Sequence, residues 1–263
     1  MPSFPDTLVH AALSAARALP AATPVFAITG LQGSGKSTLA AQVVAAAEAA
    51  GLRAATVSID DFYLTRAERG RLAREVDPLL ATRGPPGTHD LPLALATLDA
   101  LREGRPTALP RFDKLADDRL PASRWPRVAG RADLIVFEGW FLKTPAEPDE
   151  ALAAPLNALE RDEDADGTWR RWCNAALARD YPALWRRIDA LWFLRGPGFE
   201  VVPEWRWQQE QALQAAEPGR AGMARAEVER FVQFYERVSR QALRALPALA
   251  ERTLPLDRQR RAG

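Results

Sequence analysis

This sequence has few cysteines and asparagines and almost no net charge, and each of these features excludes a class of protein. The one cysteine, Cys173, excludes an internal disulfide, which favours the cytoplasm, and its setting indicates a packed helix rather than a reactive thiol. The 35 basic and 34 acidic residues leave a formal charge of +1, so we expect neither a nucleic-acid partner nor an anionic membrane partner. The two asparagines, Asn157 and Asn174, lie outside any Asn-Lys-x-Asp motif, with which guanine-specific switch proteins bind their base.

Long apolar runs are also missing. No run approaches the roughly 18 residues that a membrane span needs, and positions 1–6 lack the basic start of a signal peptide. We therefore expect no membrane segment and a cytoplasmic protein. The 263 residues fit one large α/β domain, with an N-terminal helix within 1–24, a substrate-side insertion over 62–130 and a lid region over 196–222. The oligomeric state leaves no signal in the sequence.

A complete Walker A loop, Gly-Leu-Gln-Gly-Ser-Gly-Lys-Ser, occupies residues 30–37. The apolar run at 25–29 predicts a buried strand before it, and 38–46 predicts a helix after it, so a chance glycine turn is a poor alternative. Glycines let backbone N–H groups turn toward phosphates, the lysine reaches the β- and γ-phosphates, and the last serine ligates Mg²⁺. We therefore predict a site for ATP and Mg²⁺ made by Gly30, Gly33, Ser34, Gly35, Lys36, Ser37 and Thr38.

The remaining patterns predict alternating strands and helices. Further strands are expected at 53–59, 133–140, 188–194 and 253–256. Helices are expected at 7–19, 65–83, 91–102, 168–179, 205–216 and 225–246. This order predicts an α/β fold, a P-loop NTPase three-layer α/β/α sandwich with a mostly parallel central sheet and helical lid and insertions.

Two carboxylates, Asp60 and Asp61, follow the strand at 53–59. In a parallel sheet this edge faces the ligand, beside the phosphate loop. Either acid can orient an acceptor hydroxyl and take its proton late in phosphoryl transfer, although an ordinary pKa of about 3.9 makes positioning the larger contribution. The alternative is a solvated strand end, with Asp61 capping the next helix. Tyr63 is expected to line the pocket rather than to react.

A third carboxylate, Glu138, ends the most apolar strand pattern, at 133–140. This is the Walker B position, where a carboxylate holds Mg²⁺ directly or through water. Asp60 is a second candidate beside the metal. An acid that merely ends a strand is the alternative for Glu138.

The turn-rich segment 83–90 is a candidate for binding the acceptor. Arg83 offers a two-pronged guanidinium for an anion, Asp90 can accept hydroxyl groups, and His89 stands beside it. The structural alternative is that Thr88 or Asp90 caps the next helix and that His89 is a satisfied buried histidine.

Three further cations are candidates. Arg111 and Lys114 lie on a polar loop, where solvated surface charge is the alternative. Arg206 lies between two tryptophans, where kinases of this architecture carry a lid, and it could stabilise transition-state charge; an ordinary packed arginine-tryptophan pair is the alternative.

Together these motifs resemble the D-glycerate 3-kinase family. The resemblance spans most of the chain, and segments 205–209 and 231–236 look like the bacterial branch of that family. It rests on the Walker A loop, Ser-Ile-Asp-Asp-Phe-Tyr-Leu-Thr from Ser58, Arg-Gly-x-Pro-Gly-Thr-His-Asp from Arg83, Pro-Arg-Phe-Asp-Lys from Pro110 and Phe-Glu-Gly-Trp from Phe137. One departure is residues 115–119, Leu-Ala-Asp-Asp-Arg, where plant and fungal members have a glycine-rich stretch.

The family is similar to phosphoribulokinase, uridine kinase and pantothenate kinase, which share an Asp-x-Phe motif. That resemblance implies that Asp60, not Asp61, is the base. It also implies an ATP- and Mg²⁺-dependent kinase that converts D-glycerate, a small anionic hydroxylated substrate, to 3-phosphoglycerate, with Arg83, Arg111 or Lys114 holding the carboxylate. Three alternatives stay open: the same chemistry on a nucleoside, pantothenate or another hydroxy acid; a nucleotide-binding regulatory or assembly protein; and an inactive nucleotide-binding scaffold.

Overall fold

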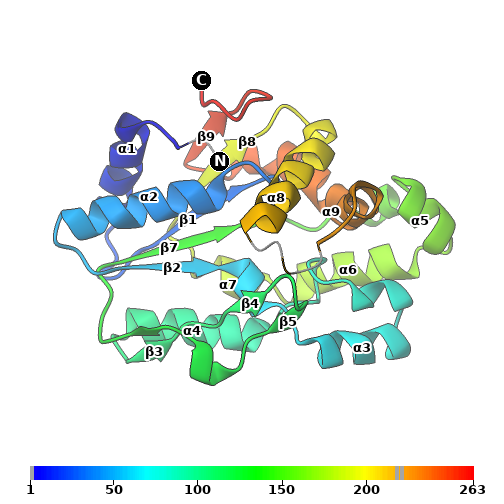
Figure 1. Ribbon diagram of the computed structural model, residues 1–263, viewed down its shortest axis with the longest axis horizontal. Coiled ribbons are helices and arrows are strands. Elements are labelled where there is room, and N and C mark those ends of the chain that lie inside the picture. The colour runs from blue at the N-terminus through cyan, green and yellow to red at the C-terminus, as the bar shows by residue number, and fades with distance from the viewer. Residues whose placement is uncertain (1–2, 217–218, 220–221) are drawn as a thin grey trace.

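A computed structural model describes residues 3–216, 219 and 222–263. Its centre is a five-stranded sheet with the order β2-β7-β1-β8-β9, in which every neighbouring pair is parallel (Figure 1). The strands are β1 (Val25–Gly30), β2 (Ala54–Ser58), β7 (Leu134–Gly139), β8 (Ala190–Arg195) and β9 (Arg252–Pro255). The predicted parallel α/β fold is confirmed. Positions 1–2, 217–218 and 220–221, which belong to the predicted N-terminal and lid regions, lie outside the described residues.

Helices cover both faces of the sheet (Figure 1). In the described residues the helices are α1 (Asp6–Arg17), α2 (Lys36–Ala49), α3 (Arg66–Glu75), α4 (Leu91–Arg102), α5 (Ala158–Glu163), α6 (Thr168–Arg179), α7 (Pro182–Trp185), α8 (Val202–Ala216) and α9 (Arg225–Ala245). No helix among them is both long and apolar enough to cross a bilayer.

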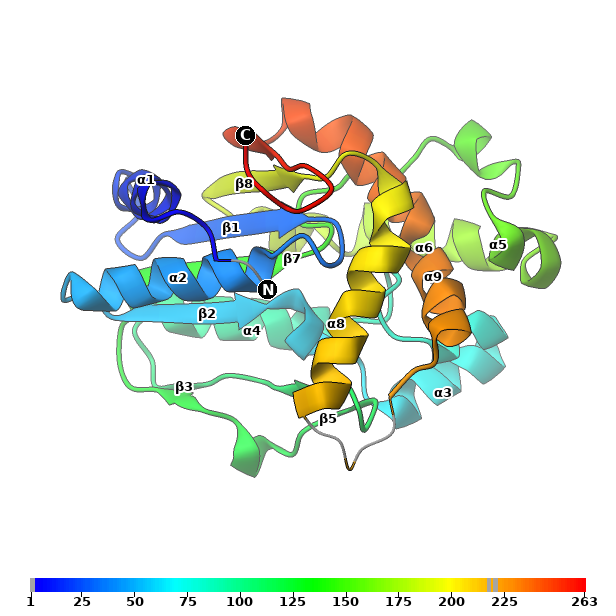
Figure 2. The same ribbon diagram turned by 45° about the horizontal axis from the view of Figure 1, so that its top comes forward.

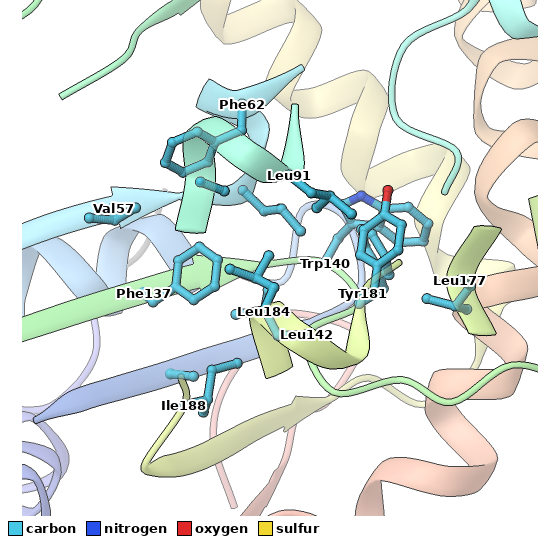
Figure 3. Close-up of a cluster of buried hydrophobic side chains, with 14 of the residues drawn as sticks. Val57, Phe62, Leu91, Phe137, Trp140, Leu142, Leu177, Tyr181, Leu184 and Ile188 are labelled. Atoms are coloured by element: carbon cyan, nitrogen blue, oxygen red, sulfur yellow. The ribbon is translucent and has the colours of Figure 1, made fainter. Parts of the chain in front are cut away.

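The central strands are buried on both faces because their side chains alternate between two apolar layers. On β1, Phe26 and Ile28 pack with α1 and α2, whereas Val25 and Ala27 face the layer built by α4, α6 and α7. Figure 3 shows part of that second layer, in which Phe137 of β7 lies among side chains of β2, α4 and α7. Cys173 is buried in α6, and burial raises the pKa of its thiol, as expected for a packed cysteine.

The expected helix at 65–83 is wrong in its length. The structure has α3, capped by Thr65 and Glu68, and then a separate 3₁₀ turn (Pro78–Ala81) capped by Asp77. Pro78 explains the break, because a proline disfavours helical backbone at the residue before it and has no N–H to donate.

Four two-residue strands in the 107–128 region carry no pattern that the sequence could reveal. They pair as β3 (Thr107–Ala108) with β6 (Arg127–Val128) and β4 (Phe112–Asp113) with β5 (Asp118–Arg119). The second hairpin lies near the carboxyl edge of the sheet, and α8 crosses beyond the same edge (Figure 2). These segments therefore enclose the space in front of the Walker A loop.

Candidate active site

The Walker A loop links β1 to α2, and two of its glycines are required by its shape. Gly33 has φ +77°, and a Cβ there would lie 2.6 Å from the Cβ of Trp205. Gly35, at φ +95°, is the N-cap of α2 and has no side chain to occupy the N–H groups of the first turn. Those N–H groups, at the positive end of a helix, are therefore available to an anion.

Two polar groups inside the loop also fit a bound phosphate. The buried hydroxyl of Ser34 has no hydrogen-bond partner among the described residues. Lys36 is 9% exposed, and its ammonium donates to the carbonyl of Leu31 at 3.0 Å. Burial lowers the pKa of Lys36, and the carboxylates of Glu138 and Asp60 partly offset that effect. A buried cation and unpaired donors around glycine backbone fit the phosphates of ATP.

A cavity of about 430 Å³ opens in front of the loop. Its volume lies within the range of roughly 300–1,000 Å³ that is typical of small-molecule sites. It brings together many of the residues predicted from the sequence, namely Gly33, Lys36, Ser37, Asp60, Tyr63, Arg83, Lys114, Glu138 and Arg206. Trp140, Gln209, Phe231 and Tyr235 also line it; they lie in segments that carry the family resemblance, but none of them was predicted as a site residue. Residues from six separate segments therefore converge beside the phosphate loop.

Asp60 faces this cavity from a 3₁₀ turn (Ile59–Phe62) that Ser58 caps. Its two carboxylate oxygens accept hydrogen bonds from the hydroxyl of Tyr63 and the ammonium of Lys114, each at 2.7 Å. Burial acts to raise the pKa of Asp60, but the charge and hydrogen bond of Lys114, with help from Tyr63 and Lys36, hold it well below its usual range. Asp60 is thus a fixed, ionised acceptor of hydrogen bonds.

Asp61 turns away from the cavity. Its carboxylate accepts from the backbone N–H of Phe112 at 3.0 Å and from Arg111 at 3.2 Å, which ties the 3₁₀ turn to β4. Burial raises its pKa to about 6, although the charge of Arg111 opposes the shift. The idea that Asp61 caps the following helix is wrong, because Thr65 caps α3. Arg111 is not among the residues that line the cavity.

Glu138 stands near the end of β7, next to Ser58 of β2 in the strand register. It is 7% exposed and lines the cavity together with Ser37. In the part of the chain that the structure describes, no three His, Cys, Asp or Glu side chains cluster as a metal site. One hydroxyl and one carboxylate fit Mg²⁺, which takes few protein ligands and completes its shell with phosphate oxygens and water.

Arg83 is held on several sides at the cavity wall. Its guanidinium carbon lies 5.5 Å from the ring centroid of Phe112 and 5.6 Å from that of Phe231. One of its terminal nitrogens binds the carboxylate of Asp117, and its carbonyl accepts from the hydroxyl of Tyr235 at 2.7 Å. A guanidinium fixed in this way is pre-organised for an anion, because its five N–H groups exceed what one carboxylate can use.

His89 and Asp90 do not line the cavity. For Asp90 the structure shows the helix-capping alternative considered from the sequence, whereas His89 is buried with only one of its ring nitrogens paired among the described residues. Asp90 caps α4 by accepting from the N–H of Leu93, and it also accepts from Arg119 at 2.8 Å. His89 is 5% exposed, and its Nδ1 lies 2.7 Å from the hydroxyl of Tyr181.

Arg206 reaches the cavity from α8. Its guanidinium is bound by Glu210, one turn along the helix, at 2.8 Å, and its carbon lies 5.8 Å from the ring centroid of Phe231. Glu210 also accepts a hydrogen bond from the backbone N–H of Met223 at 2.9 Å. It therefore links α8 to the segment just before α9. Arg206 is therefore positioned by its neighbours and remains part of the cavity wall.

Comparison with known proteins finds relatives that are named as kinases. The chain is 35% identical over 222 residues to the chloroplastic D-glycerate 3-kinase of Arabidopsis thaliana, covering 80% of this chain and 46% of that protein. It is 34% identical over 221 residues to the uncharacterized kinase mug58 of Schizosaccharomyces pombe, covering 80% and 78%. The chain thus spans about half the length of the plant relative and most of the yeast one.

Solved structures agree with these sequence matches. A D-glycerate 3-kinase from Cryptococcus neoformans superposes with a TM-score of 0.76 at 26% identity, over 97% of this chain and 95% of that one. A possible uridine kinase from Bacillus stearothermophilus shares the fold, with a TM-score of 0.53 at 16% identity over 94% and 97%. No family model matches the chain. The fold and the site define a P-loop kinase. Within that class, the chain belongs to the D-glycerate 3-kinase family.

Proposed function

We propose that this protein transfers the γ-phosphoryl group of ATP to D-glycerate, giving 3-phosphoglycerate and ADP. One observation carries the proposal: Lys36, Asp60 and Arg83 line the same cavity. They supply a phosphate-binding cation, a carboxylate for the acceptor hydroxyl and a guanidinium for the acceptor carboxylate. Acceptors without a carboxylate, such as nucleosides, offer Arg83 no anionic partner.

The donor half of the site binds ATP through Gly30, Gly33, Ser34, Gly35, Lys36, Ser37 and Thr38. Ser37 and Glu138 would hold Mg²⁺, and Asp60 lines the same cavity. When bound, Mg²⁺ neutralises charge on the β- and γ-phosphates during transfer. Lys36 stays with these phosphates as the negative charge shifts toward the leaving ADP.

In the reaction, the C3 hydroxyl oxygen of glycerate forms a bond to the γ-phosphorus. The bond between that phosphorus and the β–γ bridging oxygen breaks, and its electron pair leaves with ADP. Asp60 orients the hydroxyl and accepts its proton late, since its low pKa makes it a weak base. Arg206 compensates charge on the transferring group from the α8 side.

In this proposal three of the predicted substrate residues, His89, Arg111 and Asp90, do not contact the substrate but position other residues. His89 packs against Tyr63, their ring centroids 5.0 Å apart, and so orients the hydroxyl that binds Asp60. Arg111 fixes Asp61, and Asp90 fixes the start of α4. Lys114 neutralises Asp60 and lines the cavity, where it can also approach an anion.

ADP release with a panel of acceptors tests the proposal. D-Glycerate should support turnover, whereas L-glycerate, nucleosides and pantothenate should give little. Replacing Arg83 by Gln should raise KM for glycerate by roughly 10- to 100-fold, because a charge-assisted hydrogen bond contributes about 1.5–3 kcal/mol. Arg187→Gln, at an ion pair with Asp99 outside the cavity, is the matched control and should leave KM within about threefold of wild type. Turnover with another acceptor but not with glycerate would refute this substrate.

A cytoplasmic location, which we also propose from the single cysteine, is tested by cell fractionation.

A further inference from the structure

Two guanidinium groups of the cavity wall lie over one phenylalanine ring. The carbon of Arg83 is 5.6 Å from the ring centroid of Phe231, and that of Arg206 is 5.8 Å from the same centroid. All three residues line the cavity, and both arginines are at least nine-tenths buried. Arg83 comes from the acceptor side and Arg206 from α8, so Phe231 is a direct contact between the two halves of the site.

Contacts with a neighbouring residue of α9 hold this ring in place. Phe231 lies one helical turn before Tyr235 on α9, and their ring centroids are 5.0 Å apart. Tyr235 in turn donates its hydroxyl to the carbonyl of Arg83 at 2.7 Å. The same helix therefore holds Arg83 through its backbone and through its guanidinium.

An aromatic ring is well suited to this place. Two buried like charges repel each other, and the negative face of a ring stabilises a cation without neutralising it. A carboxylate between the arginines would compete with the ligands for their N–H groups. The anchoring carboxylates are instead separate, Asp117 for Arg83 and Glu210 for Arg206. Both guanidinium groups thus keep charge for an incoming anion.

We propose that Phe231 is a positioning residue that couples the acceptor site to the nucleotide site. An acceptor carboxylate at Arg83 reduces the repulsion between the two guanidinium groups that share this ring, so Arg206 is better placed for the γ-phosphate. By linkage, ATP then tightens acceptor binding by the same factor. The inference rests on the proposed function, because it takes Arg83 as the carboxylate site.

The test compares variants that keep or remove the ring. Phe231→Tyr retains the aromatic face, whereas Phe231→Leu and Phe231→Met retain apolar volume without it. For each, calorimetry measures the affinity of a non-hydrolysable ATP analogue with and without saturating D-glycerate, and steady-state assays give kcat and KM. We expect the Leu and Met variants to lose about five- to tenfold of the coupling, and the Tyr variant to stay near wild type.

A matched control is Trp207 of α8, which is not among the cavity-lining residues and whose ring centroid lies 5.9 Å from the guanidinium carbon of Arg225 on α9. Trp207→Leu should leave the coupling unchanged, so a loss there would point to general loosening of the helices and overturn the inference. Wild-type coupling in Phe231→Leu and Phe231→Met, or equal loss in Phe231→Tyr, would also overturn it. If wild-type enzyme does not phosphorylate glycerate at all, the proposed substrate fails instead, and the same coupling is measured with the acceptor that does turn over.

Discussion

Acidification should destabilise this protein through His89, and the structure sets the size of the effect. Burial lowers the pKa of His89 from 6.5 to about 3, although the charge of Asp60 acts to raise it. The unfolded chain therefore takes up this proton as pH falls through about 6.5, and the folded protein takes it up only near pH 3. The unfolded state binds more protons within that window, so the free energy of unfolding falls by about 1.36 kcal/mol per pH unit. Between pH 7 and pH 5 the loss is about 2 kcal/mol.

The hydrogen bonds around the ring explain why the proton is excluded. The hydroxyl of Tyr181 accepts from the N–H of Gly87 at 2.8 Å and shares a hydrogen bond of 2.7 Å with Nδ1 of His89. The other ring nitrogen, Nε2, is buried without a partner among the described residues. In the protonated ring both nitrogens are donors, so the charge would be buried with an Nε2–H that has no acceptor there.

Denaturant unfolding at pH 7, 6 and 5, followed by tryptophan fluorescence, measures this dependence. His89→Gln removes the titrating ring, so the variant should start less stable at pH 7 but lose about 2 kcal/mol less than wild type on going to pH 5. His10→Gln, at an exposed position on α1, is the matched control and should follow wild type. Parallel losses in His89→Gln and wild type would refute the reasoning.

Three further predictions concern the site and the core. Asp60→Asn should lower kcat by roughly 10²- to 10⁴-fold while calorimetry finds ATP affinity within about threefold of wild type; unchanged kcat would contradict its role. Gly33→Ala should abolish measurable nucleotide binding, since its Cβ would lie 2.6 Å from that of Trp205, whereas Gly51→Ala, with a similar φ of +79° and nothing within 4 Å, should bind normally. Phe137→Ala, fully buried in β7, should cost about 3–5 kcal/mol in denaturant unfolding, and a cost below about 1 kcal/mol would argue against the described packing.

Much of the fold could be predicted because its signals are local. β1 and β7 are buried along their whole length, and each begins with four apolar residues in a row, at 25–28 and 134–137. α4 and α6 have the predicted bounds. Asp90 marks the start of α4, and Gly167 marks the start of α6. The helix predicted at 65–83 is too long, because helix-forming residues continue past Pro78, whereas the helical backbone cannot continue through that proline. The two-residue strands had no periodicity to read.

The site divides in the same way. The donor half is contiguous in sequence, and its glycines, lysine and serine act through backbone geometry that a strand-loop-helix unit imposes by itself. The acceptor half is assembled from segments that lie far apart in the chain, so its membership depends on packing. Only the tertiary structure showed that Arg83 lines the cavity and Arg111 does not, and that Phe231, 148 positions after Arg83, contacts its guanidinium. The same holds for the two aspartates: neighbours in sequence, they point to opposite sides of one 3₁₀ turn, where Lys114 binds Asp60 and Arg111 binds Asp61. Sequence alone predicted a phosphate-binding loop, because its signal is local; the packing of distant cations and aromatic rings decided which side chains line the cavity in front of it.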